Sequence, residues 1–275
     1  MNYRHAFHAG NFADCVKHAL LVALVSALAR KPAPFAVLDT HAGRGLYDLS
    51  AETPNRTGEW RAGVGRLTDM AEGPLSPWLS LLRAAGFPPL YPGSPLLVRA
   101  LLRPGDRLIL CEKHPEEAAA LAAAIGRDRQ VAVHVRDGWE ALGALTPFPE
   151  KRGLVLIDPP FEQPGEFDRI VEACRLLRRR FRAAVVAAWY PVKHRAPVRA
   201  FEDGLREAGL TDIVSAELCL REPTDPARLN GCGMMVMNPP FGFTAEARAI
   251  LEALLSCLSD GEAGAGAEVK VVADE

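Results

Sequence analysis

Apolar residues in this chain fall into short, nearly continuous runs separated by stretches with helical spacing. Five such runs lie at residues 35–43, 107–115, 131–138, 153–160 and 183–191. Helix-like segments such as PEEAAALAAAIGR and FDRIVEACRLLRRRF lie between them, the first with acids in its opening turn. Continuous apolar strands that alternate with helices indicate an α/β fold whose parallel strands are buried on both faces.

The closing part of the chain has a different pattern. The runs at 215–222 and 231–238 are separated by eight residues that include Pro, Asp and Arg, too few for a crossover helix. They therefore predict an antiparallel hairpin. Five parallel strands followed by such a pair resemble a class I methyltransferase domain, a Rossmann-like sheet of seven strands. Residues 260–268 are expected to be a connector, and 269–275 an added edge strand.

The first two strands are separated by some 60 residues, which is long for a crossover. This stretch contains a candidate helix at 76–86, the turn YPGSP and a second helix at 95–103. We therefore expect a small helical insertion at 46–106, and a methyltransferase-like domain formed by 1–45 and 107–275.

The run ALLVALVSALA, residues 19–29, resembles the core of a signal peptide. It is too short to span a bilayer. Its leader is rich in histidine and contains Asp14, and no processing site follows. A buried helix is the better interpretation, so we expect a cytoplasmic protein without a membrane association.

Composition narrows the possible partners. The 275 residues are 49% hydrophobic and 24% charged with a net charge of −2, as in an ordinary globular protein. Because the pI is about 6.4, any binding of nucleic acid must come from a local basic patch. Six scattered cysteines without a Cys-x-x-Cys pair favour reduced buried thiols, and no metal site is predicted.

Acidic residues end successive predicted strands. Asp39 precedes a glycine-containing turn of the kind that binds nucleotides, but the third glycine of a dinucleotide-binding fingerprint is missing, which disfavours a dehydrogenase. Glu112 can accept hydrogen bonds from both ribose hydroxyls, and Asp137 from an adenine amino group while Gly138 admits the ring. Each acid alone is more simply a polar strand end. Together they fit S-adenosylmethionine.

The fourth run ends in Asp158-Pro159-Pro160-Phe161. The exocyclic amine of adenine is a poor nucleophile because its lone pair is delocalised into the ring. A carboxylate and a backbone carbonyl that accept its two hydrogens favour a tetrahedral nitrogen. Prolines supply carbonyls on a restricted backbone, and the aromatic ring can stack on a flipped base. The motif therefore predicts methylation of an amino group.

A second copy, Asn238-Pro239-Pro240-Phe241, ends the last strand of the predicted hairpin. Because that strand is antiparallel, its carboxyl end should lie at the opposite edge of the sheet, away from a cofactor near Asp39 and Glu112. We therefore interpret this copy as the end of a strand and not as an active site.

These motifs carry a resemblance to a known family. NYRHAFHAGNFADCVKH, LDTHAGRG, YPGSP and LIDPPF, in this order, resemble the bacterial 23S ribosomal RNA adenine-N6 methyltransferases of the RlmJ type. The similarity covers nearly the whole chain, including the insertion. It implies a monomeric class I enzyme that uses S-adenosylmethionine to methylate one adenine of 23S rRNA. The sequence does not identify that adenine.

The resemblance also implies functional residues. The cofactor contacts would be Lys17, His18, His41, Ser94, Glu112, Asp137, Gly138 and Asp158. Catalysis would fall to Asp158, Pro159, Phe161 and Tyr3, which occupies the place of a family tyrosine near the catalytic pocket. RNA contacts would come from Arg4, His5 and His8, because the resemblance places the N-terminal segment over the active site. The family often has tyrosine at the position of Phe161. The phenylalanine of this chain can still stack on a base, but it lacks the phenol hydroxyl.

Simpler interpretations remain for several of these positions. Lys17 and His18 can be the polar face of the first helix, and Ser94 can cap a helix. The arginine run 178–182 is either a solvated helix end or an RNA phosphate patch. A DNA adenine methyltransferase shares the Asp-Pro-Pro-aromatic motif, but no DNA-recognition domain is visible. A non-catalytic RNA-binding module is disfavoured by the intact acids.

Overall fold

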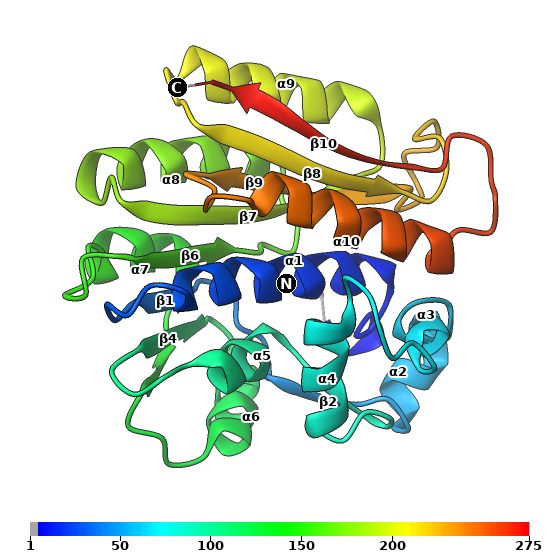
Figure 1. Ribbon diagram of the computed structural model, residues 1–275, viewed down its shortest axis with the longest axis horizontal. Helices are drawn as coiled ribbons and strands as arrows, with labels where there is room; N and C mark the ends of the chain where they lie inside the picture. Colours follow the sequence, from blue (N-terminus) through cyan, green and yellow to red (C-terminus); the bar gives the residue numbers. More distant parts are fainter. Residues whose placement is uncertain (1–4, 275) are drawn as a thin grey trace.

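The computed structural model describes residues 5–274, which form an eight-stranded sheet in the order β10-β8-β9-β7-β6-β1-β4-β5 (Figure 1). The strands of this sheet are β1 (Ala36–Asp39), β4 (Arg107–Glu112), β5 (Val131–Val135), β6 (Gly153–Ile157), β7 (Ala184–Val192), β8 (Ile213–Cys219), β9 (Gly231–Met237) and β10 (Gly266–Ala273). Five strands, from β7 to β5 in this order, are parallel, as the sequence predicts. Their carboxyl ends therefore share one edge of the sheet.

The remaining strands run in the opposite sense to their neighbours. β9 pairs antiparallel with both β7 and β8, which confirms the predicted hairpin. β10 pairs antiparallel with β8 at the edge, so the expected additional strand forms and the sheet has eight strands instead of seven. β9 thus ends at the edge where β7 begins.

Helices cover both faces of the sheet (Figure 1). One apolar core lies under α1, α4, α5, α6 and α10, and the other under α7, α8 and α9. Their bounds are α1 (Phe12–Ala29), α4 (Ser76–Ala84), α5 (Ser94–Leu101), α6 (Pro115–Ile125), α7 (Gly138–Leu145), α8 (Glu166–Arg180), α9 (Arg195–Glu207) and α10 (Phe243–Leu258). This three-layer arrangement is what near-continuous apolar strands require.

Helix α1 contains the apolar run that resembles a signal peptide. It is long and apolar enough to cross a membrane by length and composition, but 78% of the span is buried inside the fold. It packs between α5 and α10 and against β9. The run is therefore the central helix of one core, as the sequence analysis prefers.

Residues 46–106 form most of the long connection between β1 and β4. β2 (Leu46–Asp48) and β3 (Leu90–Pro92) pair antiparallel into a two-stranded sheet that the sequence pattern does not reveal. Between them lie α2 (Glu52–Thr57), α3 (Glu59–Ala62), the 3-10 turn η2 (Val64–Leu67) and α4. Helix α5, which ends this segment, packs against α1 and β4 and makes the crossover from β1 to β4.

The second Pro-Pro-Phe copy lies where the antiparallel topology predicts, at the edge away from the strand-end acids. Asn238 has a left-handed backbone, with φ of 54°. Its Nδ2 donates to the carbonyls of Arg182 and Ala184, and its Oδ1 accepts from Arg178. Asn238 therefore fixes the turn from β9 to α10 against the end of α8.

Candidate functional site

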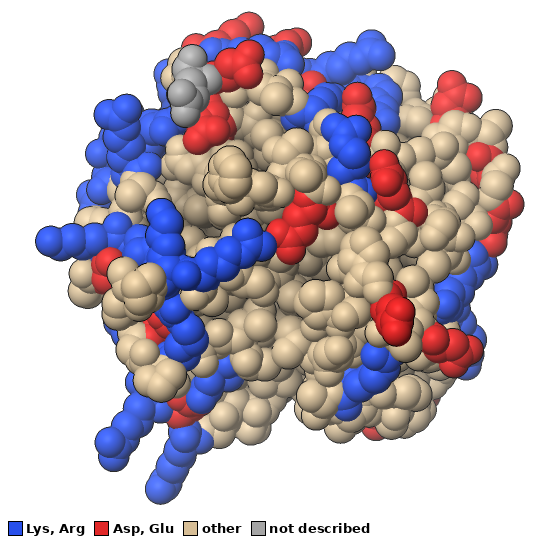
Figure 2. Space-filling model, viewed as in Figure 1, with Lys and Arg blue, Asp and Glu red and all other residues tan. Residues whose placement is uncertain are grey.

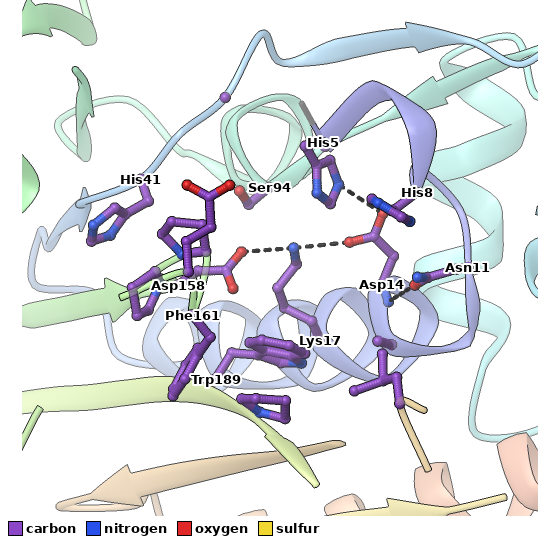
Figure 3. Close-up of a pocket in the computed structure, with 18 of the residues that line it drawn as sticks. His5, His8, Asn11, Asp14, Lys17, His41, Ser94, Asp158, Phe161 and Trp189 are labelled. Carbon is purple, nitrogen blue, oxygen red and sulfur yellow. Dashed lines mark hydrogen bonds and ion pairs between the residues drawn. The ribbon is translucent and has the colours of Figure 1, made fainter. Parts of the chain in front are cut away.

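The parallel strands end in a cavity of about 950 Å³ (Figure 3). It is lined by all of the predicted site residues that the structure describes: His5, His8, Lys17, His18, His41, Ser94, Glu112, Asp137, Gly138, Asp158, Pro159 and Phe161. Tyr3 and Arg4 lie outside the described residues. Segments far apart in the sequence thus meet at one edge of the sheet.

A buried lysine bridges two carboxylates at the centre of the cavity. Lys17 Nζ lies 2.7 Å from Asp158 Oδ2 and 2.9 Å from Asp14 Oδ1 (Figure 3). Burial opposes the charge on Lys17, but Asp14 and Asp158 outweigh it and raise the pKa of Lys17 well above its usual value. The ammonium therefore stays charged, and Asp158 is held in place from one side.

A carboxylate and a hydroxyl meet at the end of β1. Ser94 Oγ donates to Asp39 Oδ2 at 2.7 Å, and the His41 backbone N–H donates to Oδ1. Burial raises the pKa of Asp39 to about 6, although the Ser94 hydrogen bond opposes the shift. In this structure the predicted cofactor residue Ser94 therefore orients Asp39, and it does not merely cap α5.

Glu112, the last residue of β4, and Asp137, just after β5, are also fixed by backbone groups. The two Glu112 oxygens accept from the backbone N–H groups of Gly43 and His114 at 2.9 and 2.8 Å. Asp137 caps α7 by accepting from the Trp139 N–H, and it pairs with Lys113. Each carboxylate oxygen has two lone pairs, so each can accept a further hydrogen bond from a ligand.

Two predicted histidines are buried. Burial lowers the pKa of His18 to about 3 and that of His41 to about 4, so both rings are neutral near pH 7. His18 Nδ1 lies 2.7 Å from the Tyr91 hydroxyl. If His18 contacts the methionine carboxylate of the expected S-adenosylmethionine, the contact would therefore be an N–H hydrogen bond and not an ion pair.

The Asp-Pro-Pro-Phe turn sets an aromatic ring at the cavity wall. Phe161 has a left-handed backbone, with φ of 51°. Its ring meets Phe167 and Trp189 edge-on, with centroids 5.0 and 5.8 Å apart. Trp189 lies near the end of β7, the neighbour of β6, so two adjacent parallel strands contribute to this wall.

The segment that precedes α1 is tied down over the cavity. His5 Nε2 lies 3.0 Å from Asp14 Oδ2, and the Gly10 N–H donates to the same oxygen. Glu59, on α3, binds His8 at 2.8 Å through one oxygen and Asn11 at 3.0 Å through the other. Residues 46–106 therefore hold the N-terminal segment in place.

Sequence reasoning missed several lining residues. Glu59 gains its role only through His8 and Asn11, which lie about fifty residues earlier in the chain. The partners of Asp14 lie nearby in the chain, and its spacing from Lys17 by three residues on one helix is a usable signal. Trp139 directly follows the predicted Gly138, and Arg169 lies over its ring. Trp189 lies in the predicted strand 183–191, whose last residues are an aromatic pair and a proline, and this pair is a usable signal.

The chain is similar to known proteins over most of its length. A sequence model of the family described as ribosomal RNA large subunit methyltransferase D, RlmJ, matches residues 32–271. The chain belongs to the RlmJ family. It is 36% identical to ribosomal RNA large subunit methyltransferase J of Haemophilus influenzae and 35% identical to that of Escherichia coli, with 94% of each chain covered in both cases. A solved Legionella pneumophila structure matches with a TM-score of 0.85 and 33% identity, over 96% of this chain and 98% of that one.

RlmJ-family membership makes the chain a methyltransferase with a class I fold and S-adenosylmethionine as its methyl donor. The cavity fits that donor chemically. The carboxylates of Glu112 and Asp137 suit ribose hydroxyls and an adenine amino group, and Lys17 suits a carboxylate. At Gly138 an added Cβ would lie 2.0 Å from the Thr40 carbonyl, so only glycine allows this close approach of the two loops.

Proposed function

We propose that the protein methylates the exocyclic N6 amine of one adenine in 23S rRNA. The observation that carries this proposal is the position of Asp158-Pro159-Pro160-Phe161, in the same cavity as Glu112 and Asp137. S-adenosylmethionine supplies an electrophilic methyl group. We expect the reaction in the cytoplasm, by a monomer.

The cofactor end of the cavity would be formed by Glu112 and Asp137. Glu112 would accept hydrogen bonds from the ribose hydroxyls, and Asp137 from the adenine amino group, beside Gly138. His41 lies edge-on to Trp139 with ring centroids 5.5 Å apart, which gives this end a rigid aromatic wall. Lys17 and His18 would contact the methionine carboxylate.

The target amine would bind at Asp158. Lys17 donates to Asp158 Oδ2, and within residues 5–274 Oδ1 has no hydrogen-bond partner, so Oδ1 would accept one N–H of the amine. The carbonyl of Pro159 would accept the other. Fixed acceptors of this kind favour the tetrahedral nitrogen that forms as the lone pair attacks, without solvent reorganisation.

Phe161 is expected to act through its ring. Phe161→Ala should slow methylation of RNA by about 5- to 150-fold, equivalent to the 1–3 kcal/mol of base stacking. Phe161→Tyr should stay active because the ring is kept. Single-turnover rates at saturating cofactor measure both. Equal losses of rate in the two variants would show that stacking by Phe161 does not contribute to methylation.

Glu59 is expected to hold the N-terminal segment over bound RNA. Its hydrogen bond raises the pKa of His8, although burial opposes this. We call the contact of Glu59 with His8 the clamp. Because the pKa of His8 is raised, the clamp is complete at low pH and weakens as pH rises through that pKa. Because both groups are partly exposed, Glu59→Gln should raise KM for RNA only about fivefold, equivalent to about 1 kcal/mol.

The readout for Glu59 is KM for RNA between pH 6 and 9, with cofactor affinity as the control. KM of the wild type should rise with pH, and Glu59→Gln should have a high KM with little pH dependence. Parallel pH profiles of the two proteins would contradict a role for the clamp.

The proposed activity is tested by incubating the protein with S-adenosylmethionine and in vitro transcribed 23S rRNA, with adenine-rich duplex DNA as the second arm. Nucleoside mass spectrometry should find N6-methyladenosine in the RNA alone. N6-methyldeoxyadenosine in the DNA arm, with unmodified RNA, would overturn the proposal in favour of a DNA methyltransferase.

A further inference from the structure

Phe241, the aromatic residue of the second Pro-Pro-Phe copy, is fully exposed. Its side chain is 100% accessible, whereas the next most exposed large hydrophobic among the described residues, Val135, is 64% accessible. Phe241 lies in the turn between β9 and α10, at the edge of the sheet opposite the cavity. Neither the packing of the core nor the methylation reaction accounts for an aromatic ring in solvent.

The turn that bears Phe241 is rigid. Asn238 makes three side-chain hydrogen bonds, and its N–H donates to the Asp212 carbonyl. Pro239 and Pro240 restrict the next two residues, and the Phe243 N–H donates to the Pro240 carbonyl. The ring is therefore presented on a fixed support, which lowers the entropic cost of binding to it.

Arginines border this turn. Arg178 contacts Asn238 directly, and Arg182 lies beside it through its backbone carbonyl. Arg179 and Arg182 are exposed, and within residues 5–274 neither has a carboxylate within ion-pair distance. Figure 2 shows Lys and Arg side chains gathered along the left edge of the molecule, where β6 and β7 begin in Figure 1.

We propose that Phe241, Arg178, Arg179 and Arg182 form a second RNA-binding surface, called here the distal patch. An unpaired base stacks on the Phe241 ring, and the flanking phosphates bind the arginines. An exposed ring among uncompensated guanidinium groups is the combination that binds single-stranded or looped RNA. This rests on the proposed function, because a large ribosomal RNA can reach both edges of the sheet while a short target cannot.

The distal patch predicts an effect that depends on the length of the RNA. Phe241→Ala should raise the Kd and KM for in vitro transcribed 23S rRNA by about 5- to 150-fold, the range for loss of one stacked base. Phe241→Trp, which keeps an aromatic ring, should bind this RNA like the wild type. The double variant Arg179→Ala/Arg182→Ala should lower the slope of log Kd against log salt by about 1.5, as expected for two lost phosphate contacts. None of these changes should affect a short stem-loop cut from around the methylated adenine.

Two matched variants control for general effects. Val271→Ala removes another exposed apolar side chain, 55% accessible, and Arg129→Ala removes an exposed arginine between α6 and β5. Both should bind the long RNA like the wild type. The distal patch is overturned if Phe241→Ala binds long RNA normally, or if it weakens the short stem-loop equally. Because Kd is measured without turnover, this result is independent of whether the protein methylates RNA.

Discussion

Replacing Asp158 with alanine will leave the protein folded and slow methyl transfer at least about a hundredfold, the lower range for a positioned polar catalytic group. The fold should survive because Lys17 keeps its 2.9 Å contact with Asp14. The methyl-transfer rate of Asp158→Asn should fall between those of the wild type and Asp158→Ala. An amide oxygen can accept one hydrogen bond, but it cannot balance the charge of Lys17.

The matched control is Asn238→Ala in the second Pro-Pro-Phe copy. Loss of its three side-chain hydrogen bonds should lower the free energy of unfolding by about 1–3 kcal/mol without a comparable loss of turnover at saturating RNA. Single-turnover rates alongside thermal melts separate the two effects. An active Asp158→Ala protein together with an inactive, folded Asn238→Ala protein would show that the site has been assigned to the wrong edge.

Replacing Glu112 with alanine should weaken binding of S-adenosylmethionine by about 10- to 150-fold, equivalent to 1.5–3 kcal/mol for charge-assisted hydrogen bonds. Two causes would act together, because the change removes the proposed ribose contact and also frees the Gly43 N–H of the turn after β1. Glu112→Gln should lose less, since it keeps an acceptor.

Titration calorimetry of the apoprotein measures this affinity directly. Glu116→Ala, which removes an exposed carboxylate in the first turn of α6 that does not line the cavity, is the matched control and should bind like the wild type. Unchanged affinity in a folded Glu112→Ala protein would exclude Glu112 from the cofactor site.

The parallel sheet could be predicted from local sequence patterns. A buried parallel strand is a continuous apolar run, and the acid at its end marks the carboxyl edge of the sheet. The hairpin followed from the length of the connection alone, since the eight residues 223–230 cannot form a crossover. The placement of Asn238 at the opposite edge was then a consequence of topology. Side-chain chemistry and connectivity were both readable from the sequence here.

Features built from distant partners were not predictable in the same way. The two-stranded sheet pairs β2 with β3 across some forty residues that contain several helices, and its strands are only three residues long. The contact between Lys17 and Asp158 joins positions 141 residues apart. Lys17 was expected to contact the cofactor, and its pairing with the carboxylate of the Asp-Pro-Pro-Phe motif emerged only from the structure.

The central claim is that this chain methylates N6 of one adenine in 23S rRNA. Its most direct test is mass-spectrometric mapping of N6-methyladenine in 23S rRNA from a strain that lacks the protein. One adenine should lose its methyl group, the wild-type protein should restore it, and Asp158→Ala should not. An unchanged set of N6-methyladenines in the 23S rRNA of that strain would contradict the account.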